Sequence, residues 1–149
     1  MNPEQLIRES LAAFNARDEE KAFGIFADDL VVNNIMPHPI GLEEFKALNM
    51  ANLVAFPDWH FEIKQIQIQG DKATVTVQIT GTQTGPINLP GMPSIPPTGK
   101  KISVPDAFIC TISADNKLHQ MDFATPPDGG FPGTMKQLGI QMPGMDARA

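Results

Sequence analysis

The chain has 149 residues, with 11 Lys and Arg against 17 Asp and Glu, a formal net charge of −6 and an isoelectric point near 4.9. This acidic balance argues against nucleic acid and anionic membrane as partners, because binding a polyanion needs a stripe of Lys and Arg. The length suits one domain over residues 1–149 with a single core. The one cysteine excludes an intramolecular disulfide, and no two histidines have the spacing of metal ligands, so we expect no metal site.

No targeting or membrane-spanning segment is visible in the sequence. The first ten residues, MNPEQLIRES, lack the basic region and the following apolar region of a secretory signal. No apolar run approaches the roughly 18 residues that a membrane span requires. We therefore expect a cytoplasmic protein with no membrane partner.

Three helices are predicted in the first part of the chain. Asn2 is a suitable cap for the first, in which Ile7, Leu11 and Phe14 fall on one buried stripe. Asp18 can cap a second, short helix that follows a break in the apolar pattern. Both helices are expected to bury one face.

The second helix is expected to end before residues 28–29, and a brief strand is expected over residues 30–35. The third helix is predicted from residue 41 to about residue 55. Asn49 and Asn52 share the apolar stripe of this helix. They either face a rim and bond to backbone, or point into a polar spot of a cavity.

From residue 59 the apolar period changes to two, which is typical of strands. Residues 59–69 and 72–84 predict two long strands joined by a turn at 70–71. The apolar side chains of the first strand change face part-way along it. A bulge near residues 64–65 would explain this change and would bend the sheet.

A second hairpin is predicted from two apolar runs at residues 102–112 and 118–124. The Pro-rich stretch before it, residues 85–99, is expected to be a lid or binding loop, because long loops without secondary structure are usually functional. The hairpin carries Asp106 and Asp122 at strand positions where an apolar residue would be ordinary. These two carboxylates are the first candidates for general acid/base chemistry.

Helices followed by a bent, mostly antiparallel sheet predict an α+β fold with the helices gathered against one face. At most one further short helix is expected, around residues 134–138. A strongly curved sheet half-closed by helices leaves a cone whose interior can hold a small apolar ligand. Eight Met and nine Phe with no Tyr either fill the core or line such a pocket.

Further candidate residues follow from the expected direction of their side chains. In a register without a bulge, His119, Met121 and Phe123 face the pocket and Asp122 faces the other way. The other candidates for lining it are Phe14, Asn34, Trp59 and Phe108. If both carboxylates entered one cavity, their like charges would raise one pKa and create an acid/base pair.

Several short motifs are similar to those of SnoaL-like polyketide cyclases, in the nuclear-transport-factor-2-like superfamily. They are GTQTGP at 81–86, IPPTGK at 95–100 followed by ISVP at 102–105, Leu118 after a hairpin turn, MKQLG at 135–139, AFN at 13–15 and FPD at 56–58. The resemblance covers nearly the whole chain. It implies a cone-shaped sheet of the SnoaL type with three N-terminal helices, and a homodimer formed through the open sheet face.

Cyclases of this family close a ring by an intramolecular aldol reaction without metal or cofactor, so the resemblance implies no cofactor. An Asp of the last strand is their general acid/base, and a Gln and a His of the preceding strand help bind the substrate. In this sequence the Gln position corresponds to Asp106 and the His position to Phe108. The Asp position corresponds to Phe123, with Asp122 one place earlier.

Two functions are therefore expected. One is cofactor-free cyclase or isomerase chemistry on a small apolar carbonyl compound, with Asp122 or Asp106 as the base. The alternative is a protein of the same fold that binds a small apolar ligand without catalysis, because Phe108 and Phe123 replace the polar residues of the family.

Overall fold

The computed structural model describes residues 2–88 and 93–140 of the chain. Four helices and five strands follow one another as α1 (Pro3–Asn15), α2 (Glu19–Phe23), β1 (Phe26–Asn33), α3 (Leu42–Ala55), β2 (His60–Gln69), β3 (Lys72–Thr82), β4 (Lys101–Ile112), β5 (Leu118–Phe123) and α4 (Gly130–Leu138). The strands form one sheet in the order β1-β5-β4-β3-β2, in which β1 and β5 are parallel and all other pairs antiparallel.

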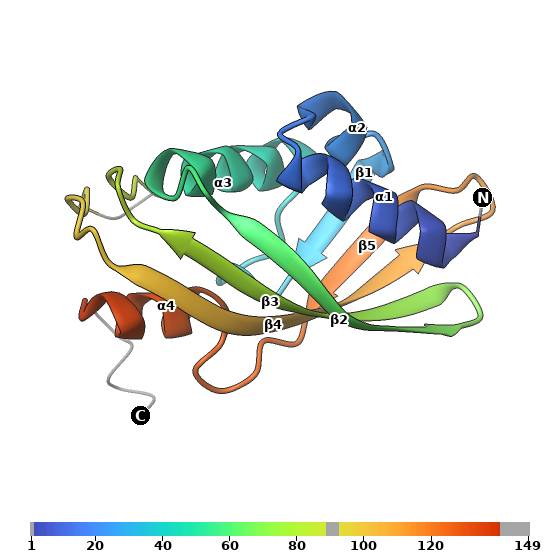
Figure 1. The fold of residues 1–149 in the computed structure, drawn as a ribbon. Coiled ribbons are helices and arrows are strands. Elements are labelled where there is room, and N and C mark those ends of the chain that lie inside the picture. Colours follow the sequence, from blue (N-terminus) through green and yellow to red (C-terminus); the bar gives the residue numbers. More distant parts are fainter. Residues whose placement is uncertain (1, 89–92, 141–149) are drawn as a thin grey trace.

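The long strands β2, β3 and β4 twist strongly, and α1, α2 and α3 lie together above the sheet (Figure 1). The sheet is curved and remains open, so the predicted α+β class is confirmed. The predicted homodimer through the open face stays a prediction. None of the described helices has the length and apolarity needed to cross a membrane.

The helix starts follow from local sequence. The side chain of Asn2 accepts a hydrogen bond from the Gln5 amide at 2.8 Å, and the Gln5 side chain accepts one from the Asn2 amide at 3.2 Å. Asp18 accepts from the Lys21 amide at the start of α2, as predicted. However, α2 ends at Phe23, and residues 28–29 lie inside β1, which begins earlier than expected. Phe26, which lies in the stretch expected to be helical, is therefore the first residue of β1.

The predicted bulge in β2 is confirmed. Ile63 pairs with Val77 of β3, whereas Gln65 pairs with the adjacent Thr76, so Lys64 is the extra residue. An extra residue turns the following side chains to the other face and increases the local twist. The change of apolar side in this strand thus has the physical cause that the sequence indicated.

The two central strands supply the core by simple alternation. On β3 and β4 every second residue is buried beneath the helices, namely Ala73, Val75, Val77, Ile79, Gly81, Ile102, Val104, Asp106, Phe108, Cys110 and Ile112. Ten of these eleven positions hold an apolar residue, a glycine or a thiol. The eleventh is Asp106, which places a carboxyl group on the concave face of the sheet.

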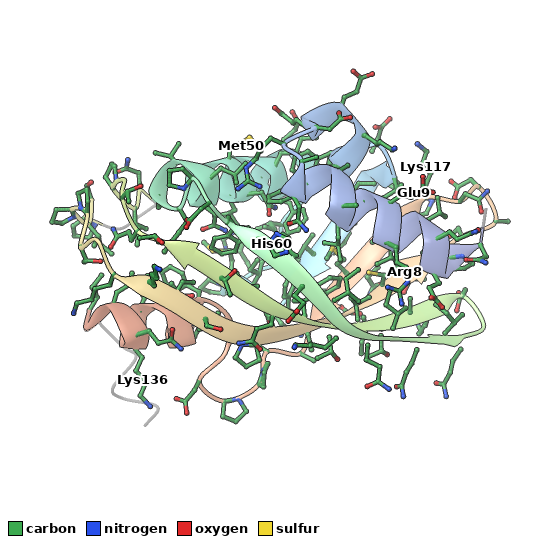
Figure 2. The ribbon with its side chains drawn as sticks, viewed as in Figure 1. Arg8, Glu9, Met50, His60, Lys117 and Lys136 are labelled. Atoms are coloured by element: carbon green, nitrogen blue, oxygen red, sulfur yellow. The ribbon has the colours of Figure 1, made fainter. Side chains whose placement is uncertain are left out.

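The β4–β5 hairpin is confirmed, and its turn is tied to the segment between α2 and β1. Lys117 Nζ donates to the Gly24 carbonyl at 2.7 Å, and the Leu118 amide donates to the Ile25 carbonyl at 2.7 Å. Figure 2 places Lys117 beside the N-terminal helices. These bonds fix β5 between β1 and β4.

The predicted C-terminal helix is present and longer than expected. It begins at Gly130, and on its last turn Gln137 forms a pair of 2.8 Å hydrogen bonds with the backbone of Ser103 on β4. In the Pro-rich stretch, Ile87 and Ile95 form an antiparallel bridge. Residues 89–92 at the centre of the expected lid lie outside the described residues, so the lid stays a prediction.

The end of β3 approaches the end of α3 so closely that only glycine fits there. The amides of Thr84 and Gly85 both donate to the Ala55 carbonyl at 3.1 Å. A Cβ atom built on Gly85 would lie 2.1 Å from the Val54 carbonyl oxygen, inside van der Waals contact with a backbone atom. This contact fixes the C-terminal end of α3 over the sheet.

Replacing Gly85 by Ala is therefore expected to lower the free energy of unfolding by about 2 kcal/mol, because backbone must move to admit the methyl group. Chemical denaturation measures this loss. Gly41→Ala is the control, since a Cβ there would lie 3.8 Å from its nearest atom, the Leu30 oxygen. Equal losses in the two variants would contradict the close approach.

Candidate functional site

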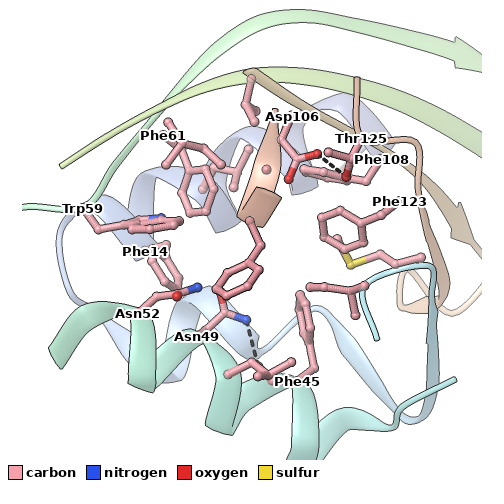
Figure 3. A pocket seen from close by; sticks show the side chains of 18 of the residues that line it. Phe14, Phe45, Asn49, Asn52, Trp59, Phe61, Asp106, Phe108, Phe123 and Thr125 are labelled. Carbon is pink, nitrogen blue, oxygen red and sulfur yellow. Dashed lines mark hydrogen bonds between the residues drawn. The ribbon is translucent and has the colours of Figure 1, made fainter. Parts of the chain in front are cut away.

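Between the concave face of the sheet and the helices lies a cavity of about 680 Å³. All four helices and all five strands of the described chain contribute to its lining, together with some of the segments between them. This volume falls in the range of small-molecule sites. Figure 3 shows aromatic rings from several elements converging on it.

Ring contacts link most of the cavity wall. On one side Phe14 lies edge-on to Phe61 with centroids 5.2 Å apart, and Phe61 lies 5.9 Å from Trp59. On the other side Phe45 lies 6.4 Å from Phe123, which lies 5.4 Å from Phe108. Such edge-on and tilted pairs are stabilising beyond their buried area. The wall is therefore apolar, and it is built from residues far apart in the sequence.

Seven of the nine candidate site residues line this cavity: Phe14, Asn34, Trp59, Asp106, Phe108, Met121 and Phe123. Asn34 adopts a positive φ of 70° after β1, and its amide donates to the Phe123 carbonyl at 3.3 Å. Trp59 is buried, and its Nε1 has no hydrogen-bond partner among the described residues. The remaining two candidates, Asp122 and His119, lie elsewhere.

Asp106 is the carboxylate of the cavity. It is 8% exposed, and Oδ1 accepts hydrogen bonds from the Ala107 amide at 2.9 Å and from Thr125 Oγ1 at 2.8 Å. Burial raises the pKa of this carboxyl group above its ordinary value, while the bonds from Thr125 and Ala107 oppose the rise. A carboxylate with a raised pKa in an apolar site is suited to proton transfer.

The sequence and the fold were both compared with those of known proteins. The model of the SnoaL-like domain matches residues 7–121, which is most of the chain. The chain belongs to the SnoaL-like family. The resemblance drawn from its motifs is thereby confirmed. No curated protein matches this SnoaL-like chain.

Solved structures with the same fold include AclR, a proposed hydroxylase from Streptomyces galilaeus, with 22% identity, a TM-score of 0.76, and coverage of 92% of this chain and 95% of that one. TsrD from Streptomyces laurentii has 24% identity, a TM-score of 0.73 and coverages of 93% and 95%. IdmH, a proposed polyketide cyclase from Streptomyces antibioticus, has 21% identity, a TM-score of 0.72 and coverages of 94% and 100%. At these identities the likeness establishes the shared fold alone.

His119 does not face the cavity. The expectation that it would do so assumed a strand without a bulge, and this assumption is wrong. Thr111 of β4 pairs with Gln120, whereas Ile112 pairs with Leu118, so His119 is an extra residue in β5. The bulge turns His119 outward and leaves Leu118 and Met121 both buried. On the outside, His119 Nδ1 lies 2.8 Å from Asp29 and Nε2 lies 2.9 Å from Asp115.

Asp122 is on the convex face of the sheet, as the simple parity expected. Its neighbour in the ladder is Ile109, and it does not line the cavity. Its carboxylate accepts hydrogen bonds from Asn33 Nδ2 at 2.7 Å and from Gln120 Nε2 at 2.9 Å. The two carboxylates of the hairpin therefore do not form a pair in one cavity. Because Phe108 pairs with Phe123, the even-numbered residues of β4 share the concave face with Met121 and Phe123, whereas Asp122 pairs with the outward Ile109.

Other polar and titratable groups of the cavity were not assigned a site role from the sequence. Asn49 and Asn52 both line it, and Asn49 Nδ2 donates to the Phe45 carbonyl at 2.8 Å (Figure 3). Thr125 lies in an irregular segment after β5, where no pattern singles it out. Cys110 also lines the cavity, and burial raises its pKa to about 12, so it is a neutral thiol at physiological pH.

Within residues 2–88 and 93–140, no group of three or more His, Cys, Asp or Glu side chains is arranged to hold an ion. The described side chains that line the cavity offer one carboxyl group, one thiol, several neutral hydrogen-bonding groups and an apolar wall.

The placement of His119 predicts a pH-dependent contribution to stability. Hydrogen bonds to Asp115 and then to Asp29 raise its pKa above the ordinary 6.5. A raised folded-state pKa gives a stabilisation that is fully present below the unfolded pKa and is lost as the pH rises through the folded pKa. His119→Gln should therefore destabilise the protein more at pH 5.5 than at pH 8.5, as measured by denaturation across this range. A difference independent of pH would contradict the ion pairs.

Proposed function

We propose that this SnoaL-like protein carries out cofactor-free acid/base chemistry on a small, largely apolar carbonyl compound held in the cavity, with Asp106 as the base. The observation that carries the proposal is a buried carboxyl group set in an apolar wall, with one oxygen that accepts no hydrogen bond from the described residues. Burial penalises the charged form of the carboxyl group and so makes the carboxylate a stronger base.

The chemistry needs few groups. The carboxylate takes a proton from a carbon beside a carbonyl, and the electron pair of the broken C–H bond moves onto the carbonyl oxygen to give an enolate. The enolate then either attacks a second carbonyl of the same molecule, which closes a ring, or regains the proton at another carbon, which is an isomerisation. In both cases the carboxylic acid returns its proton to the product, so no external oxidant or reductant is needed.

The wall opposite the carboxylate supports binding and orientation. In Figure 3, Asn49 and Asn52 of α3 lie on the side of the cavity away from Asp106 and Thr125. Because Asn49 uses its amide nitrogen on the Phe45 carbonyl, its oxygen is left as an acceptor. Asn52 makes no side-chain hydrogen bond with the described residues, so it offers both a donor and an acceptor to a carbonyl or hydroxyl group of the substrate.

Replacement of Asp106 by Asn keeps the shape of the side chain and removes the base. We expect it to lower kcat by about 100-fold or more on model carbonyl compounds that enolise, since general acid/base catalysis typically contributes this much. Steady-state kinetics measures the loss. Asp122→Asn is the matched comparison, because that carboxylate lies on the other face of the sheet and its change should have little effect. Unchanged turnover in Asp106→Asn would overturn the proposal.

A second candidate function is binding of an apolar ligand without chemistry. The favouring observation is the wall of linked aromatic rings, which stabilises an apolar or planar molecule whether or not it reacts. Asp106→Asn distinguishes the two candidate functions. We expect the variant to keep its affinity for the apolar molecule under either function, whereas a loss of turnover is expected only if the protein is an enzyme.

A fluorescent apolar probe is expected to bind the protein saturably at one site. Leu48 lines the cavity from α3, and Leu48→Arg should weaken probe binding by at least about tenfold, because a charge replaces apolar wall. The control is Val54→Arg on the same helix, where the side chain is 56% exposed and outside the cavity. A fluorescence titration measures both. The absence of saturable binding would count against both candidate functions.

A further inference from the structure

The two oxygens of Asp106 have different surroundings, and the difference starts with the chain after β5. Phe123 is the last residue of β5 and pairs with Phe108, and the Ala124 amide then donates to the Ala107 carbonyl at 2.8 Å. This bond continues the ladder by one step, so Thr125 comes opposite Asp106. The β4–β5 register thus sets a hydroxyl group directly across from the carboxylate.

Oδ1 of Asp106 is occupied by the protein. It accepts the Thr125 hydroxyl at 2.8 Å and the Ala107 amide at 2.9 Å, whereas Oδ2 accepts no hydrogen bond from the described residues. In Figure 3 the bonded oxygen faces Thr125 and the other points into the cavity. A carboxylate oxygen that holds two donors is less basic than one that holds none.

Gly130, the first residue of α4, packs closely against Thr125 and Asp106. It has a φ of +53°, and a Cβ atom there would lie 2.7 Å from Thr125 Cγ2 and 3.2 Å from Asp106 Oδ2. Glycine is therefore required, both for the backbone conformation and for the close approach of α4. The start of α4 thereby restricts the movement of Thr125 and of the carboxyl group.

We propose that Thr125 is the positioning residue of this site: it holds Oδ1 of Asp106, so that Oδ2 is the oxygen that takes the proton from the substrate and returns it. In the forward step the substrate C–H bond breaks and an O–H bond forms at Oδ2. The return step reverses this at the product carbon. The inference rests on the proposed function. It adds which oxygen of Asp106 transfers the proton and which residue positions the carboxyl group.

Among the described residues, no charged side chain contributes to the pKa of Asp106, which is set by burial and by the bonds from Thr125 and Ala107. Of the described residues that line the cavity, Asp106 and Cys110 are the two that titrate. On β3 the neighbour of Asp106 is Val77. On α4, Lys136 bonds to Asp128 at 2.8 Å and projects away from the sheet (Figure 2). The hydroxyl of Thr125 is therefore a main opposing influence on a pKa that burial raises.

The test compares Thr125→Val, which keeps the shape and removes the donor, with Thr125→Ser, which keeps the donor. The carboxyl group of Asp106 is followed by carbon-13 NMR during a pH titration, which needs no substrate, and its resonance is assigned with Asp106→Asn. Thr76→Val is the matched control, because Thr76 is the β3 neighbour of Ala107 on the convex side. If valine prevents folding, the smaller Thr125→Ala serves in its place.

We expect the titration of Asp106 to shift upward in Thr125→Val and to stay at the wild-type position in Thr125→Ser and Thr76→Val. The acidic limb of the kcat/KM profile should shift by the same amount, with about tenfold less activity on that limb and recovery at higher pH. A carboxyl titration unchanged in Thr125→Val, or an equal shift in Thr125→Ser, would overturn the positioning role.

The two proposals fail in different ways. If the NMR titration shifts as expected while Asp106→Asn retains full turnover, the base assignment fails, and with it the role of Oδ2 in proton transfer. If Asp106→Asn is inactive while Thr125→Val titrates and reacts like the wild type, the base stands and the positioning role is wrong.

Discussion

The carboxyl group of Asp106 occupies an inward position of β4 between Val104 and Phe108, which are both buried. A charge placed there loses its hydration, and the loss is offset only where hydrogen-bond donors replace water. The Ala107 amide and the Thr125 hydroxyl provide such donors, on one of the two oxygens. The same burial that destabilises the ionised form raises its pKa, so one constraint governs both the stability of this corner and its chemistry.

The cavity around that group exists because the sheet curves while the helices remain at a distance from it. The bulge at Lys64 bends β2, and aromatic side chains from α1, α3 and the strands meet each other across the concave face. At the end of β3, the Thr84 and Gly85 amides bind the last carbonyl of α3. Near the same end of the sheet, α4 packs against β4 through Gln137, whose partner Ser103 lies opposite Thr80 of β3. The cavity is lined mainly by rings and aliphatic groups.

Two bulges in the same sheet show how far a sequence pattern can be followed. The one in β2 could be predicted, because apolar residues change from odd to even positions over ten residues. The one in β5 could not, since that strand has six residues and its bulge lies at the second of them. The expectation that His119 faces inward failed for this reason. Alternation in β4 is uninterrupted, so the inward direction of Asp106 is readable from the residues around it.

The sequence did not predict the roles of residues whose contacts are made with parts of the protein distant in the chain. For Asn49 and Asn52 the sequence left open a rim position bonded to backbone or a place in a cavity. The packing of α3 puts both in the cavity lining, and Asn49 also bonds to the Phe45 carbonyl. Thr125 carries no local signal, because its role comes from the β4–β5 register and from the approach of α4.

By itself the sequence determined the α+β class, the SnoaL-like family and most element boundaries, since periodicity, caps and turns are local properties of the chain. Only the tertiary structure decided that His119 turns outward and which oxygen of Asp106 accepts no hydrogen bond from the described residues. Those outcomes depend on strand register and on close backbone approach, where a shift of one residue reverses the result.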